Sequence, residues 1–201
     1  MGGPSIKRGE SSGDIWTPQV FIDAVERNWG PLAVDLAATP QSAKAPVWID
    51  EKRNSLSPDV GWSVLRGNLW LNPPYSNITP WARKCAESYE LNEQVEIFLL
   101  VPASIGANWF WDWVWPYATV YSVGRMVFDN CFDKHGNLVT TPYPKDLILA
   151  HYTNTTPSSV LQRWPWKLSL TKEEADLVIG AIPLQALPDA SAQSAAGGSS
   201  E

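Results

Sequence analysis

The sequence predicts an α/β fold with a mostly parallel central sheet that is covered by helices on both faces. Patterns typical of helices and of short buried strands alternate along the chain, as in folds built from β-α-β units. The strongest strand pattern covers residues 95–101, a near-continuous apolar run of the kind that a central strand needs. The 201 residues, 44% of them hydrophobic and 18% charged, suffice for one domain with a single sizeable core.

The first half of the chain predicts one helix and three short strands. Thr17 and Pro18 fit a helix N-cap and the first helical position, and the apolar spacing that follows fits one helical face as far as Gly30. Residues 37–45 predict a helix or a turn. The three strands are expected at residues 32–36, 47–49 and 69–71.

The second half predicts further helices and strands around the central run. The Trp-rich segment 109–115 favours a helix, because it follows the central strand after a short loop. A second helix is expected at 80–89, and strands at 119–123 and 125–128, on either side of Gly124, and at 146–152. We expect an ordered body over residues 14–180, with flexible tails rich in small and polar residues at 1–13 and 181–201.

Composition narrows the function classes. No apolar run approaches the roughly 20 residues that a membrane-spanning helix needs, so no membrane partner is expected. Cys85 and Cys131 are far apart and form no metal-binding pattern with the two histidines, which predicts free thiols and no metal site. The net charge of −6 disfavours a nucleic-acid partner, although a local basic face is compatible with it.

The residues with the clearest chemistry are Asn72, Pro73, Pro74 and Tyr75, directly after a short apolar strand. Two prolines cannot continue a strand ladder or a helix, so they fix a stiff loop at the strand's carboxyl end, where α/β sheets bind ligands. The Asn72 side-chain oxygen and the Pro73 carbonyl can accept both N–H bonds of an exocyclic amine and direct its lone pair towards a methyl donor. Tyr75 offers a ring on which a flipped base can stack. A plain turn is the alternative, and the flanking strand and helix disfavour it.

This loop resembles the catalytic loop of enzymes that methylate amino groups, and a longer resemblance covers about residues 16–152. Over that stretch the chain is similar to the phage-type Dam family of DNA N6-adenine methyltransferases. The shared features occur in one order: Trp16-Thr17-Pro18, the segment 34–39, the segment 56–62, the Asn-Pro-Pro-Tyr-Ser loop, the segment 100–103 with Trp109-Phe110, and Gly124-Arg125 before Phe128.

The resemblance implies a Rossmann-like methyltransferase domain that uses S-adenosylmethionine. Trp16, Thr17 and Pro18 match the segment that contacts the methionine end of this cofactor, and Asp35 matches the acid that takes its ammonium group. Ala37 is small enough for close backbone approach. Asp50 or Glu51 is placed to bind the ribose hydroxyls, and Asn54 stands near the adenine ring where an acid is expected.

The resemblance also implies DNA as partner, in the cytoplasm of a bacterial host, and shielding of phage DNA from restriction as the role. Ser76, Trp109, Arg125, Lys134 and Lys145 are the candidate substrate and DNA contacts. A chain of this length has little space for a separate recognition domain, so it is expected to act as a monomer or a homodimer.

Two other functions stay open at this point. The first keeps the methyl transfer but changes the acceptor to N4 of cytosine, RNA or a protein glutamine; cytosine-N4 enzymes more often carry Ser in place of Asn72. The second is a non-catalytic, nucleic-acid-binding relic of the fold, which the intact loop disfavours. Neither cysteine follows a proline, which counts against methylation at cytosine C5.

Overall fold

The computed structural model describes residues 15–131 and 138–171, and its centre is a seven-stranded sheet. The strands lie side by side in the order β2-β1-β3-β4-β6-β5-β7. Their bounds are Leu32–Asp35 (β1), Val47–Trp48 (β2), Asn68–Leu71 (β3), Glu96–Pro102 (β4), Ala118–Gly124 (β5), Leu147–Tyr152 (β6) and Val160–Arg163 (β7).

Most neighbouring strands are parallel, as predicted. β1 pairs in parallel with β2 and β3, β3 with β4, and β5 with β7, whereas β6 is antiparallel to both β4 and β5. The carboxyl ends of β1, β3 and β4 therefore meet at one edge of the sheet. Pro102 pairs with Leu147 and Gly124 with Leu147, so β5 ends and β6 begins at that same edge.

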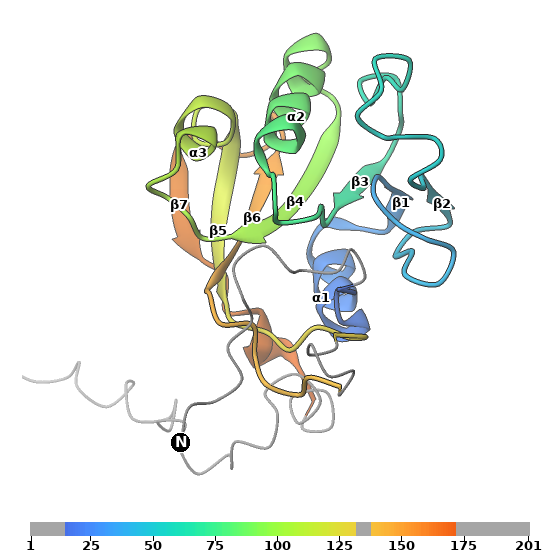
Figure 1. The fold of residues 1–201 in the computed structure, drawn as a ribbon. Helices are drawn as coiled ribbons and strands as arrows, with labels where there is room; N and C mark the ends of the chain where they lie inside the picture. Colours follow the sequence, from blue (N-terminus) through green and yellow to red (C-terminus); the bar gives the residue numbers. More distant parts are fainter. Residues whose placement is uncertain (1–14, 132–137, 172–201) are drawn as a thin grey trace, which may run out of the picture.

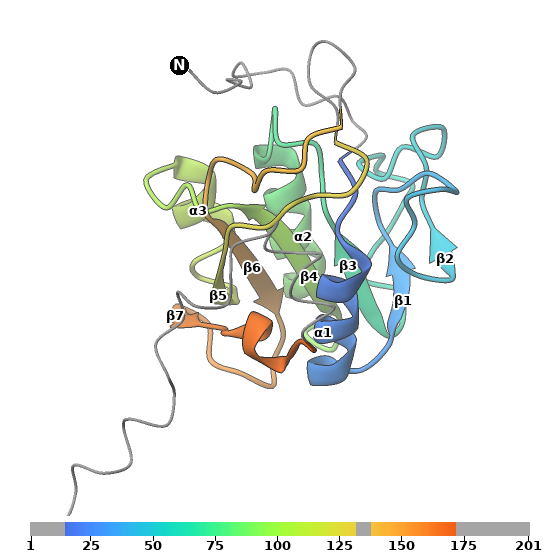
Figure 2. The same cartoon turned by 90° about the horizontal axis from the view of Figure 1, so that it is seen from below.

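Helices cover both faces of the sheet (Figures 1 and 2). The helices α2 (Thr79–Leu91) and α3 (Asn108–Trp113) lie on one face, and α1 (Gln19–Trp29) and the 3-10 helix η1 (Trp166–Ser169) lie on the other. Each face has its own buried cluster, and β4 contributes alternate residues to the two clusters. This explains why β4 reads as a continuous apolar run in the sequence.

The core under α1 is unusually aromatic. Phe21 packs edge-on against Trp70 of β3 and Trp166 of η1, with ring centroids 6.2 and 4.7 Å apart. The buried indole of Trp166 donates a hydrogen bond to the Val123 carbonyl at 3.0 Å. That bond satisfies the one polar atom of the side chain and fixes η1 against β5.

Two local predictions are wrong. Residues 125–128 form no strand, although Met126 and Phe128 are buried in alternation, because the chain leaves the ladder at Gly124, whose φ is +70°. Thr17 is not the N-cap of α1; the N-cap is Pro18, which has no side-chain capping hydrogen bond. The helices at α1, α2 and α3 and the turn over residues 37–45 are confirmed, whereas β7 and η1 were not predicted.

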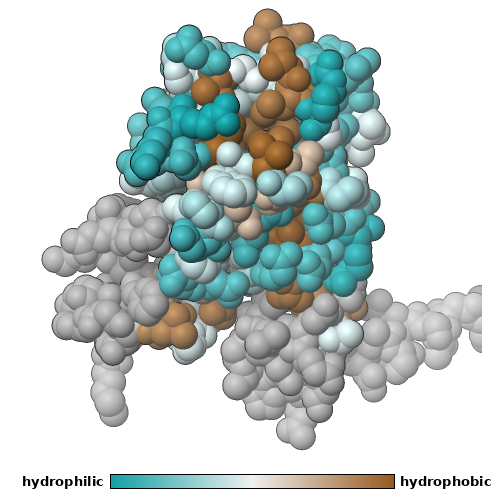
Figure 3. All heavy atoms as spheres, turned by 90° about the vertical axis from the view of Figure 1, so that its right-hand side faces the viewer, coloured by the Kyte–Doolittle hydropathy of each residue, from teal (hydrophilic) through white to brown (hydrophobic). Residues whose placement is uncertain are grey.

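The β2 edge of the sheet is mostly hydrophilic, with a narrow hydrophobic strip (Figure 3). Val47 and Trp48 of β2 are 54% and 37% exposed, so this two-residue strand covers little of the core. Within residues 15–131 and 138–171, no helix is long and apolar enough to cross a membrane.

Gly67 provides a test of how tightly β3 is joined to β1. Its φ is +80°, and a Cβ atom there would lie 2.8 Å from the Ala33 Cβ. We expect Gly67→Ala to lower the free energy of unfolding by about 2–3 kcal/mol, through backbone strain and overpacking, as measured by urea denaturation. Gly106→Ala is the control, because a Cβ at Gly106 meets nothing within 4 Å. If both variants unfold at the same urea concentration, Gly67 does not make the close approach to Ala33 described above.

Candidate active site

A cavity of about 580 Å³ lies at the edge where β1 and β3 end. This volume lies within the range of small-molecule and cofactor sites. Its walls come from five parts of the chain: the segment before α1, the loop after β1, the loop after β2, the end of β3 with the loop that follows, and α2. They contribute residues 15–17, 35–39, 42, 44, 49–51, 54–55, 70, 72–75 and 81.

Asp35, the last residue of β1, organises the loop that follows it. Its carboxylate accepts backbone N–H bonds from Ala37 at 3.2 Å and from Lys44 at 3.0 Å. The loop is further tied to β2, since the Ile49 N–H donates to the Asp35 carbonyl at 2.8 Å. The side chain is 3% exposed and forms part of the cavity wall. A carboxylate is therefore presented to any ligand at the floor of the cavity.

Burial raises the pKa of Asp35 to about 6, and the hydrogen bonds from Lys44 and Ala37 only partly oppose the rise. Removal from water penalises the charged form more strongly than two backbone donors stabilise it. A cation bound beside Asp35 would reverse this imbalance. Such a carboxyl group is typical of a binding site for a positively charged ligand.

Asn72 follows directly after β3, and its amide orientation is fixed by a distant segment. Its Nδ2 donates to the Ile15 carbonyl at 3.3 Å. Because a carbonyl only accepts, the nitrogen must face Ile15, and the side-chain oxygen is left to face Tyr75. The Tyr75 hydroxyl donates to that oxygen at 2.8 Å. The amide oxygen keeps a second lone pair for a further donor.

Tyr75 lies at the centre of an aromatic group. Its ring is 6.3 Å from Phe128 and 5.7 Å from Tyr143, both at steep angles, and Phe128 and Tyr143 also contact each other. Burial raises the pKa of Tyr75 well above its usual value, so its hydroxyl remains a donor at neutral pH. The sequence did not indicate Phe128 and Tyr143 as neighbours of this loop.

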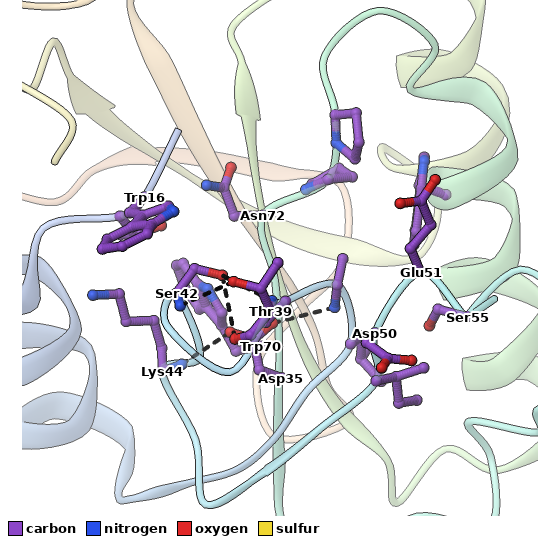
Figure 4. Close-up of a pocket in the computed structure, with 18 of the residues that line it drawn as sticks. Trp16, Asp35, Thr39, Ser42, Lys44, Asp50, Glu51, Ser55, Trp70 and Asn72 are labelled. Atoms are coloured by element: carbon purple, nitrogen blue, oxygen red, sulfur yellow. Dashed lines mark hydrogen bonds between the residues drawn. The ribbon is translucent and has the colours of Figure 1, made fainter. Parts of the chain in front are cut away.

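The opposite wall of the cavity is formed by the loop after β2. Figure 4 shows Asp50, Glu51 and Ser55 on one side of the pocket, Trp16 and Lys44 on the other, and Asn72 between them. Lys84 of α2 holds this loop by donating to the carbonyls of Ser55 at 2.7 Å and Ser57 at 2.8 Å. 

The same loop is anchored by a buried tryptophan. The indole of Trp62 donates to the Ser55 hydroxyl at 3.2 Å, and the Lys84 ammonium lies 5.1 Å from the centre of the Trp62 ring. Trp62 in turn stacks on Trp81, which lines the cavity from α2. The two acids of this wall therefore sit on a braced loop.

Two cavity residues, Thr17 and Lys44, have side-chain polar groups that form no hydrogen bond with the part of the chain that the structure describes. The Thr17 hydroxyl is buried and has no hydrogen-bond partner among the described residues. Buried hydroxyls are normally paired, so an unpaired one at a cavity wall suggests a missing ligand. Burial lowers the pKa of Lys44, while the nearby Asp129, Asp35 and Asp23 oppose that shift.

The structure brings most of the predicted site residues together. All four residues of the Asn-Pro-Pro-Tyr loop line the cavity, and so do the predicted cofactor contacts except Pro18, which instead forms the N-cap of α1. Those contacts are Trp16, Thr17, Asp35, Ala37, Asp50 and Asn54.

The four predicted substrate contacts that the structure describes do not line the cavity. Ser76 is exposed directly after the Asn-Pro-Pro-Tyr loop, and Trp109 packs against the α2 face of the core. Arg125 pairs with Asp146 at 3.3 Å on the surface, next to the exposed Lys145. Lys134 falls outside the described residues.

Several cavity residues were missed in the sequence. Ser42, Lys44, Ser55, Trp70 and Trp81 line the cavity and belong to no motif, and Thr39 also lines it but was noted only as part of the matching segment 34–39. The distance from Asp35 along the chain offers a weak signal for Thr39, Ser42 and Lys44, because a short loop after a strand stays near its end. Nothing in the sequence marks Trp81 as a wall residue.

Comparison with known proteins decides the family. The profile of the DNA N-6-adenine-methyltransferase (Dam) family matches residues 6–157, about three quarters of the chain. The chain belongs to the Dam family. The chain is also similar to the DNA N-6-adenine-methyltransferase of Escherichia phage T1, with 31% identity over 98 residues. That match covers 48% of this chain and 39% of the phage protein.

The raised pKa of Asp35 makes a prediction about the stability of this Dam-family chain. Because the folded-state pKa of about 6 exceeds the unfolded value of 3.8, protonation favours the folded state. This contribution is fully present below pH 3.8 and lost as the pH rises through 6. Between pH 4 and pH 7, ionisation of Asp35 should therefore lower the free energy of unfolding of the wild-type protein by about 2 kcal/mol. Asp35→Asn should not show this decrease.

The measurement is urea denaturation of both proteins across that pH range. The amide offers one acceptor where the carboxylate offers two, so absolute stability falls and the difference between the two pH profiles is the readout. Asp59→Asn, at an exposed position, serves as control. Parallel profiles for wild type and Asp35→Asn would show that Asp35 does not titrate in this range.

Proposed function

We propose that this protein transfers a methyl group from S-adenosylmethionine to the exocyclic N6 amine of adenine in DNA. The observation that carries the proposal is the fixed amide of Asn72 at the wall of a cofactor-sized cavity. Membership of the Dam family supports adenine in DNA as the acceptor. The name of the phage T1 relative supports the same acceptor.

The residues around the cavity fit the proposed cofactor. S-adenosylmethionine, when bound, supplies an electrophilic methyl group on a sulfonium sulfur. Asp35 offers a carboxylate to its ammonium group, and the wall of the same cavity includes Thr17, whose hydroxyl has no partner among the described residues. Asp50 and Glu51 on the opposite wall offer acceptors to the ribose hydroxyls. The cavity thus has complementary groups at both ends.

The chemistry at the amine is assigned to Asn72 and Pro73. The Asn72 oxygen and the Pro73 carbonyl accept hydrogen bonds from the two N–H groups of the adenine amine, which localises the lone pair on nitrogen and orients it for in-line displacement. The amine nitrogen gains the bond to the methyl carbon as the bond from that carbon to sulfur breaks; the neutral thioether leaves, and the amine loses one proton to solvent. The hydrogen bond to Ile15 keeps the amide from rotating, so the acceptor is in place before the base arrives. Preorganised acceptors of this kind lower the barrier without reorganisation during the reaction.

Tyr75 is assigned to the flipped base. An adenine inside a duplex must be extruded before it reaches this loop, and an aromatic face compensates the lost stacking by roughly 1–3 kcal/mol per base. In the structure the Tyr75 hydroxyl donates a hydrogen bond to the Asn72 oxygen. The adenine amine either becomes a second donor to that oxygen or displaces the tyrosine hydroxyl. Phe128 and Tyr143 pack against the Tyr75 ring.

The test is a labelling experiment. The protein is incubated with methyl-labelled S-adenosylmethionine and unmethylated DNA, and the DNA is digested to nucleosides. Label in N6-methyldeoxyadenosine is the expected result. Label in N4-methyldeoxycytidine, or label only in RNA or protein offered in parallel, would show that adenine in DNA is not the acceptor. If no acceptor is labelled, the protein is a non-catalytic relic of the fold.

Asn72→Ala tests the acceptor role. We expect methyl transfer to fall at least about 100-fold, because a preorganised acceptor is lost, while the dissociation constant for S-adenosylmethionine changes only a few-fold. Single-turnover kinetics measure the first quantity and calorimetry the second. Asn77→Ala, at an exposed asparagine two residues after Tyr75, is the matched control. Near-normal turnover of Asn72→Ala would show that its assigned role is wrong.

Two substitutions of Tyr75 separate its ring from its hydroxyl. Tyr75→Phe keeps the stacking face and should retain kcat/KM for DNA within about tenfold. Tyr75→Ala removes the face and should lower kcat/KM by about 5- to 150-fold, the equivalent of 1–3 kcal/mol of stacking. Steady-state kinetics with a short duplex distinguish the two. If Tyr75→Phe is as impaired as Tyr75→Ala, the hydroxyl and not the ring is the essential group.

A further inference from the structure

Lys44 is the one cationic side chain among the described residues that line the cavity. Three acids, Asp35, Asp50 and Glu51, line the same cavity. No hydrogen bond or ion pair joins the Lys44 ammonium to another residue within 15–131 and 138–171, although three carboxylates lie near enough to affect its pKa. A partly buried ammonium without a close partner is costly, so its position calls for an explanation.

The backbone of Lys44 is fixed by the same carboxylate that the proposed function assigns to the cofactor ammonium. Its N–H donates to the Asp35 Oδ2 at 3.0 Å, nine residues after Asp35 itself. The Lys44 side chain lies on the Trp16 side of the pocket, away from Asp50 and Glu51 (Figure 4). Asp35 and Lys44 thus place opposite charges at one end of the cavity.

We infer that Lys44 binds the carboxylate of the methionyl end of S-adenosylmethionine, with the Thr17 hydroxyl as a second donor to the same group. The inference rests on the proposed function and deepens it. The methionyl end carries an ammonium and a carboxylate on one carbon, and an acid with a base beside it is the complementary arrangement. The buried, unpaired Thr17 hydroxyl at the cavity wall is the independent sign of a missing acceptor.

Two other roles for Lys44 make different predictions. If it only neutralises Asp35 and Asp129, its loss would affect fold stability and every ligand of the cavity alike. If it contacts a DNA phosphate, its loss would raise KM for DNA and leave cofactor binding unchanged. Only a carboxylate contact makes the effect of the substitution depend on whether the ligand carries a carboxylate.

The test compares S-adenosylmethionine with its decarboxylated analogue, which lacks only that group. Calorimetry gives the dissociation constants of both ligands for the full chain, without DNA. We expect wild type to prefer S-adenosylmethionine by about 10- to 100-fold, the range of a charge-assisted hydrogen bond. Lys44→Met, which keeps the length of the side chain, should reduce the preference to within about threefold, and Lys44→Arg should largely retain it.

The controls keep the outcomes separable. Lys52→Met, at an exposed lysine on the loop of Asp50 and Glu51, should leave the preference unchanged. Thermal unfolding verifies that each variant folds, and Lys44→Gln replaces Lys44→Met if the latter does not. A preference that survives in Lys44→Met, or equal weakening of both ligands, overturns the assignment while the proposed function stands. Failure of wild type to bind either ligand overturns the proposed function and the assignment together.

Discussion

The buried carboxylate of Asp35 is the contact on which the site depends. It ends β1, accepts the N–H groups of Ala37 and Lys44, and so closes the loop between β1 and β2 over a few residues. Without these bonds, two part-buried backbone donors would lose their partner, and the loop that lines the cavity would be held less firmly. The cost is a carboxyl group whose pKa is raised to about 6, in a position where a ligand cation would stabilise its charged form.

The other loops that line the cavity are also held by hydrogen bonds to neighbouring elements. Lys84 and Trp62 fix the loop of Asp50 and Glu51 against α2, and the loop of Asn72 is fixed against the segment before α1. Asp50 and Glu51 on one side and the Asn72 amide on another are thus held by different parts of the chain around one cavity. Three of the acids that contribute to the net charge of −6, which disfavours DNA when averaged over the chain, line this cavity: Asp35, Asp50 and Glu51.

Sequence reasoning predicted the fold class, the three helices and six of the seven strands, because these elements carry regular apolar patterns. It failed at residues 125–128, where Met126 and Phe128 alternate inward without a neighbouring strand to pair with. It also missed β7, whose four residues are mostly exposed and carry no alternation. The Asn-Pro-Pro-Tyr loop was singled out because it directly follows a short apolar strand, and Asp35 because it matches an acid of the family at the end of the first strand. Lys44 and Trp81 were not, since their place at the cavity depends on loop closure and on packing of α2.

The hydrogen bond from Asn72 to Ile15 spans 57 residues and has a practical consequence. An amide side chain has two orientations of similar energy, and the Ile15 carbonyl, which can only accept, favours the one that turns the oxygen towards the Tyr75 hydroxyl. A shortened protein that starts at Trp16, or a tag that displaces this segment, would keep the whole Asn-Pro-Pro-Tyr loop. Its Asn72 side chain would still present the amide nitrogen in place of the oxygen part of the time. Preparations trimmed for crystallisation would then show weak activity that originates in the amino-terminal segment, far from the loop to which it would be attributed.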